Sequence, residues 1–70
     1  MRFFKGTDGW SVEDCDQRVP ADIEDTRYDS REQLERALYE WIDKQERKAT
    51  KAFRKMRLEV REACEWNRDF

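Results

Sequence analysis

The sequence predicts a mainly α-helical domain with a small N-terminal β-hairpin, and three observations support this. An apolar stripe recurs at helical spacing through residues 30–67, and these 38 residues contain neither Gly nor Pro. Both glycines and the one proline fall in residues 1–29. Seventy residues form one small domain at most. We expect residues 1–70 to divide into a hairpin (1–12), an acidic arm (13–29), a helix (30–67) and a tail (68–70).

The amino-acid composition favours a folded protein without a membrane-spanning segment. Charged residues make up 46% of the chain and hydrophobic residues 37%, but three Trp, two Tyr and four Phe can still build a core. No apolar run approaches the roughly 18 residues of a membrane span, and no signal-peptide pattern is present. We therefore expect a folded cytoplasmic protein with no membrane partner.

An Asp-Gly pair between short aromatic runs predicts the hairpin over residues 1–12, because both residue types tolerate positive φ. Counting from either a two-residue or a four-residue loop places Phe3, Trp10 and Val12 on one face of the hairpin. Phe4 falls on the opposite face in both cases. We expect the first three side chains to cover the core and Phe4 to remain outside it.

Residues 13–29 follow as an acidic arm that contains the only proline. Residues 1–35 carry ten acids and five bases, whereas residues 36–70 carry seven acids and ten bases. An acidic arm of this kind could imitate a phosphate track and occupy a basic groove on another protein. The candidate acids for such mimicry are Glu13, Asp14, Asp16, Asp22, Glu24 and Asp25.

The helix begins at Ser30, because Ser30 with Gln33 three positions on matches a capping box. On a wheel of 100° per residue, twelve mostly apolar or small residues from Leu34 to Cys64 fall within a sector of roughly 140°. This stripe keeps its phase to residue 64, as expected of one uninterrupted helix. Its predicted interface residues are Leu38, Trp41, Ile42, Gln45, Ala49, Ala52, Phe53, Met56 and Val60.

The stripe is thin in its middle, where Gln45, Ala49 and Ala52 replace large apolar residues. One explanation is that the chain breaks near residues 47–50 and folds back as a monomeric helical hairpin. The other is that the helix is unbroken and its small residues allow a second helix to approach closely. The lack of Gly, Pro or Asn at 47–50 favours the unbroken helix. A 38-residue rod spans roughly 57 Å, more than a hairpin and an arm can cover. We therefore expect a helix-mediated homodimer.

A catalytic site is not predicted. Histidine, the commonest general base and metal ligand, is absent, and there is no Gly-rich phosphate loop. Cys15 lies between acidic neighbours rather than beside a base that would activate it. Cys15 and Cys64 are expected as reduced thiols, with a disulfide as the alternative, and they cannot complete a zinc site without carboxylates. We expect no enzyme, cofactor or metal.

The basic half of the chain provides the alternative function. Residues 47–58 hold six bases and no acid, and five of them could follow nucleic-acid phosphates along one helix face. These are Arg47, Lys48, Lys51, Arg54 and Lys55. The net charge of −2 and the lack of an interleaved aromatic face argue against this function.

The sequence favours a small non-enzymatic protein that binds another protein. Aromatic residues off the stripe are suitable anchors for a partner. They are Phe4, Tyr39, Trp66 and Phe70. Size and charge suit an accessory inhibitor or adaptor of the kind that phages and plasmids encode, an analogy from size and character alone. The mechanism would be occlusion of a partner's working surface by the rigid dimer. Nucleic-acid binding through residues 47–55 and nucleic-acid mimicry through residues 13–29 are the alternatives.

Overall fold

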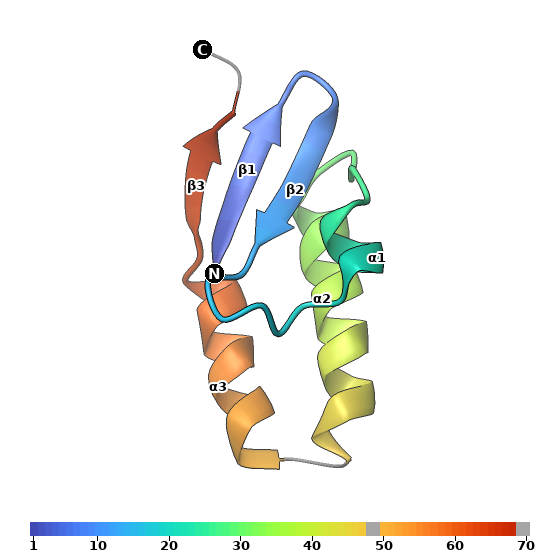
Figure 1. The fold of residues 1–70 in the computed structure, drawn as a ribbon, viewed down its shortest axis with the longest axis vertical. Coiled ribbons are helices and arrows are strands. Elements are labelled where there is room, and N and C mark those ends of the chain that lie inside the picture. The colour runs from blue at the N-terminus through green and yellow to red at the C-terminus, as the bar shows by residue number, and fades with distance from the viewer. Residues whose placement is uncertain (48–49, 69–70) are drawn as a thin grey trace.

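The chain forms an α+β fold, and the prediction of a mainly α-helical protein is wrong. The computed structural model describes residues 1–47 and 50–68, and across these residues a three-stranded sheet packs with a helical hairpin (Figure 1). The elements in chain order are β1 (Arg2–Gly6), β2 (Gly9–Glu13), α1 (Ala21–Glu24), α2 (Arg31–Glu46), α3 (Thr50–Arg61) and β3 (Cys64–Asn67). The strand order β2-β1-β3 places the N-terminal strand in the centre of the sheet.

The predicted hairpin forms as the antiparallel pair β1–β2, with a two-residue turn between Gly6 and Gly9. Phe3 and Val12 are partners in register, and both side chains are buried in the core. Trp10 packs against the same core from the same face, as the alternation of the strands predicts. The hairpin therefore provides one wall of the core.

The acidic arm continues from β2 and returns to bond with the same strand near residue 28. Tyr28 forms an isolated antiparallel bridge with Trp10, in which the Trp10 amide donates to the Tyr28 carbonyl at 2.7 Å and the Tyr28 amide donates back at 2.8 Å. Val19 is buried beside the hairpin residues, and α1 begins directly after Pro20. Segment 14–29 thus wraps from the end of β2 to the outer edge of the same strand.

Helix α2 begins where the sequence predicts. The Ser30 hydroxyl oxygen accepts a hydrogen bond from the Gln33 amide at 3.3 Å, and the Gln33 side-chain oxygen accepts one from the Asp29 amide at 3.4 Å. These two bonds satisfy donors at the start of the helix, as in a capping box. Buried Leu34, Leu38 and Ile42 then line its inner face.

The single helix predicted over residues 30–67 is wrong, because the chain folds back between α2 and α3 (Figure 1). The apolar stripe of α2 packs against that of α3 within one molecule, and Met56 and Val60 are 1% and 0% exposed. Trp41 and Phe53 meet across the two helices in an edge-to-face contact of 5.6 Å. Since the stripe is covered by its own chain, the helix-mediated homodimer loses its physical basis.

The last turns of the predicted helix form a strand instead. Residues Cys64–Asn67 leave the end of α3 and pair in parallel with β1, so that β3 is an edge of the sheet. Helical periodicity cannot predict a strand over these residues, because its partner β1 lies about sixty positions away in the sequence.

None of the helices among the described residues is long and apolar enough to cross a bilayer.

Candidate functional site

The turn between α2 and α3 gathers the cations of the basic half at one end of the molecule. We call this end, residues 43–57, the basic tip. The described cations there with exposed side chains and no ion pair are Lys44 and Arg47 at the end of α2, and Lys51, Arg54 and Lys55 at the start of α3. Lys48, also predicted as a nucleic-acid contact, lies outside the described residues.

The two acids of the basic tip are held by a single arginine. Arg57 donates from Nε to Glu46 at 2.5 Å and from Nη2 to Asp43. These hydrogen bonds raise the pKa of Arg57, with Glu46 the larger contributor, and burial only partly opposes them. Asp43 and Glu46 therefore both contact Arg57, and none of the other described cations of the basic tip forms an ion pair with them.

The net charge of the protein hides a strong internal separation. Residues 43–57 contain seven cations and two acids, a net charge of +5, so the other 55 residues sum to −7. The first turn of α3 contains no acid that would oppose the positive end of its helix dipole. The overall charge of −2 therefore does not describe the potential at the basic tip.

A second group of predicted residues meets on the sheet. Phe4 and Trp66 are partners in register across the parallel pair β1–β3, on the face opposite buried Phe3. Arg2 lies over the Trp66 ring at 5.6 Å from its centroid, and Arg68 lies over the Phe4 ring at 5.0 Å. We call Arg2, Phe4, Trp66 and Arg68 the aromatic face.

The other predicted anchors do not join the aromatic face. Tyr39 lies on α2, where the Arg57 guanidinium approaches its ring to 5.9 Å. Phe70 lies outside the described residues. Of the four aromatic anchors, the structure therefore brings together Phe4 and Trp66, which β-sheet pairing makes neighbours despite a separation of 62 positions.

The stripe residues predicted as a dimer interface mostly belong to the internal core. Leu38, Ile42, Met56 and Val60 are buried, whereas Trp41, Gln45 and Phe53 are half-buried and Ala52 is exposed. Ala49 lies outside the described residues. The apolar members of the stripe thus hold α2 and α3 together.

The predicted mimic acids do not form one exposed row. Asp14 is buried, and its carboxylate is held by Arg18 at 2.9 Å and 3.0 Å. Asp16 is exposed but lies 3.6 Å from the same guanidinium. Glu24 is half-buried, and the exposed remainder is Glu13, Asp22 and Asp25. Phosphate mimicry by these six residues together is therefore not supported by their placement.

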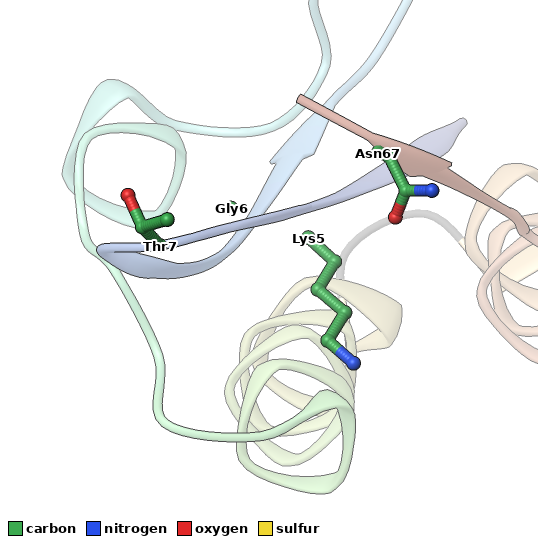
Figure 2. Close-up of a pocket in the computed structure, with 4 residues that line it drawn as sticks. All are labelled: Lys5, Gly6, Thr7 and Asn67. Atoms are coloured by element: carbon green, nitrogen blue, oxygen red, sulfur yellow. The ribbon is translucent and has the colours of Figure 1, made fainter. Parts of the chain in front are cut away.

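A shallow pocket of about 230 Å³ lies near the turn of the hairpin, lined by Lys5, Gly6, Thr7 and Asn67. Figure 2 shows the Lys5 and Asn67 side chains extending from the same side of the sheet, with Thr7 in the turn that follows β1. The Lys5 ammonium also lies 5.8 Å from the Trp10 ring centroid. The pocket is wide open, and a single ammonium with two neutral polar side chains gives it little selectivity.

No metal or redox centre is apparent in the described part of the chain. No group of three or more Cys, Asp or Glu is close enough there to hold a metal ion. Cys15 and Cys64 are both free and exposed. The groups suited to ligand contact are therefore the cations of the basic tip and the rings of the aromatic face.

Comparison with protein-family models, with curated proteins and with solved structures finds no match to this chain.

The sequence pattern identified most cations of the basic tip but missed Arg2 and Arg68 of the aromatic face. Arg2 could have been found from the alternation of side chains along β1, which places Arg2 and Phe4 on one face. Recognising Arg68 requires the pairing of β3, which no local pattern reveals.

Proposed function

We propose that this chain is a non-enzymatic nucleic-acid-binding protein whose basic tip contacts the phosphate backbone. One observation carries the proposal: the described tip presents five exposed cations without ion pairs, while Arg57 occupies both nearby acids. Ammonium and guanidinium groups placed along phosphates release condensed counterions, which provides affinity independent of base sequence. Of the contact residues predicted from the sequence, Arg47, Lys51, Arg54 and Lys55 are among these five cations.

The acidic remainder of the molecule is compatible with this proposal. A body of charge −7 behind a tip of charge +5 makes the protein strongly dipolar along its long axis of 39 Å. A polyanion attracts the basic tip and repels the acidic arm, so the charge pattern favours one orientation of approach. Contact through the tip alone gives modest affinity that falls steeply with salt.

A protein partner is the second candidate. Among the described residues, Leu58 and Trp66 are large hydrophobic side chains that remain 55% and 50% exposed. Leu58 lies on α3 and Trp66 on β3. Tryptophan is enriched among the hot-spot residues that contribute most of the binding energy at protein interfaces. An inhibitor or adaptor would bind through these side chains, without the dimeric rod that the fold excludes.

Fluorescence anisotropy tests the nucleic-acid proposal directly. The probes are a labelled DNA duplex of about 20 base pairs and a labelled dT oligonucleotide, titrated between about 50 and 200 mM salt. The test variant is Lys51→Gln/Lys55→Gln, and the matched control is Arg36→Gln/Arg61→Gln. Arg36 in the second turn of α2 and Arg61 at the end of α3 are exposed and lie away from the tip. Each variant loses two positive charges.

The proposal predicts how much the salt dependence of binding changes in each variant. Removal of two phosphate contacts lowers the slope of log K against log salt by about 1.8 for the duplex and about 1.4 for the single strand. The control variant is expected to keep the wild-type slope. Absence of binding by the wild type at about 50 mM salt, or an equal loss of slope in the control, would overturn the proposal.

A further inference from the structure

The aromatic face combines side chains whose flat surfaces lie next to each other. Neighbouring strands of a sheet are about 4.8 Å apart, so Phe4 and Trp66, as partners in register, are adjacent on the same face. The side chains of Arg2, Trp66 and Arg68 are exposed, and Phe4 is half-buried. Two aromatic rings and two guanidinium groups therefore form one surface on β1 and β3.

The arginines of this surface hold their guanidinium groups against rings. Arg2 and Arg68 have ring contacts at 5.6 and 5.0 Å, and no ion pair is found for either within residues 1–47 and 50–68. Each cation is therefore positioned over an aromatic ring and still available to an anion. Glu13, the register partner of Arg2 on β2, is an acid on the same face and marks its margin on that side.

We propose that the aromatic face takes unpaired bases of a single-stranded nucleic acid, an inference that rests on the nucleic-acid-binding function proposed above. Bases of a single strand are unstacked and present flat faces that stack on aromatic rings and on guanidinium planes. Arg2 and Arg68 lie within the same surface, so they can contact the phosphates that connect the stacked bases. Bases within a duplex are stacked on one another and cannot reach Phe4 or Trp66.

The composition of the face favours bases over an apolar protein segment. Its side chains are two aromatic and two cationic, with Cys64 the register partner of Arg2 at one end, and it contains no aliphatic residue. An apolar segment would need to displace or desolvate both guanidinium groups, whereas a polyanion with planar bases satisfies the cations and the rings together. Together with the basic tip, the face gives the molecule separate contacts for phosphates and for bases.

The test compares Trp66→Ala with a matched control, Leu58→Ala, which removes the other large exposed hydrophobic side chain. The probes are a labelled dT oligonucleotide of about 15 nucleotides and a labelled duplex of similar length. Trp66→Ala is expected to weaken dT binding about 5- to 100-fold and to leave duplex binding unchanged. Leu58→Ala is expected to leave both unchanged, and Trp66→Phe, which keeps a ring, is expected to stay near wild type for dT. Urea unfolding of each variant checks its global stability, and hydrogen exchange at the β3 amides checks that β3 remains folded.

The outcomes separate this inference from the function on which it rests. If Trp66→Ala changes dT and duplex affinity equally, or changes neither, while Lys51→Gln/Lys55→Gln weakens both, the basic tip binds nucleic acid and the inference about bases is wrong. If the wild type binds neither probe at about 50 mM salt, both proposals are wrong and the aromatic face serves another kind of ligand, such as a protein. Loss of dT binding in Trp66→Ala with retention in Trp66→Phe supports the inference.

Discussion

Arg18 holds both carboxylate oxygens of Asp14 and reaches Glu59 on α3 at the same time. Its Nε and Nη2 donate to Asp14 at 2.9 and 3.0 Å, and its Nη1 lies 2.9 Å from Glu59. The Asp14 carboxylate also accepts from the backbone amides of Arg18 and Asp16. One guanidinium therefore connects the loop after β2 with the second half of the helical hairpin.

Replacement of Asp14 by Ala is expected to destabilise the protein by about 2–3 kcal/mol. The change removes two charged hydrogen bonds from a side chain that is 1% exposed, and it leaves the Arg18 guanidinium without its main partner. Urea unfolding at neutral pH measures the loss. Asp16→Ala is the matched control, because that carboxylate is 72% exposed and a change of less than about 0.5 kcal/mol is expected. Similar losses in the two variants would contradict the assigned role of Asp14.

The same carboxylate makes stability depend on pH. Burial raises the pKa of Asp14, but hydrogen bonds from the Arg18 side chain and from the amides of Arg18 and Asp16 outweigh burial, so the pKa lies below its ordinary value. A lowered carboxyl pKa contributes stability above the pKa of the unfolded chain, and this contribution is lost as pH falls through the folded pKa. We expect the urea midpoint of the wild type to decline below about pH 4 more steeply than that of Asp14→Asn. Parallel declines would show that Asp14 is not responsible.

Gly9 is expected to tolerate no side chain. Its φ is +120°, and a Cβ there would lie 2.7 Å from the Tyr28 carbonyl oxygen, the acceptor of the Trp10 amide. Gly9→Ala therefore combines backbone strain with displacement of the bridge between β2 and the acidic arm, at a cost of about 2–3 kcal/mol. Gly6→Ala, at a glycine whose φ is not positive, is expected to change the free energy of unfolding by less than about 1 kcal/mol. Equal costs at both positions would refute this explanation.

The local features of the fold were predictable from the sequence, and the long-range pairings were not. Strand alternation identified Phe3 and Val12 as core residues, and the Ser30–Gln33 pair located the start of α2. The fold-back between α2 and α3 was misjudged because a short interruption left the apolar stripe in phase on the wheel. The available signal for the fold-back was the lack of large apolar residues in the middle of the stripe, beginning at Gln45. The sequence between the two helices contains no Gly or Pro that would have marked a turn.

The candidate site shows the same division. Cations close together in sequence, such as Lys51 and Lys55, were identified because helical spacing alone places them on one face. The meeting of Phe4 with Trp66 was missed because it requires a parallel strand pair across most of the chain. The aromatic residues that the pairing of β1 with β3 brings together lie on the sheet and are not interleaved with the cations of the basic tip.

The core of the helical hairpin predicts a monomer. Leu38, Ile42, Met56 and Val60 are each at most 1% exposed within one chain, so the described part of the stripe is already covered without a second copy. Sedimentation equilibrium is expected to give the mass of a single chain at all concentrations. Leu38→Ala is expected to cost about 2–5 kcal/mol, and its urea midpoint is expected to be independent of protein concentration. A dimer mass, or a midpoint that rises with concentration, would restore an intermolecular role for the stripe.

Arg31 is expected to control the position of the strand that carries Trp66. From the first turn of α2 it lies 2.6 Å from Glu35 and 2.6 Å from Glu65 on β3, and its guanidinium is 4.8 Å from the Phe3 ring centroid. Arg31→Met removes both ion pairs and is expected to lower the free energy of unfolding by about 1–2 kcal/mol. The loss is small because Glu65 is half-exposed and its charge is partly screened by solvent. Hydrogen exchange is expected to increase at the β3 amides more than at those of β2. An equal increase in both strands would mean that Arg31 supports the whole sheet and does not specifically hold β3.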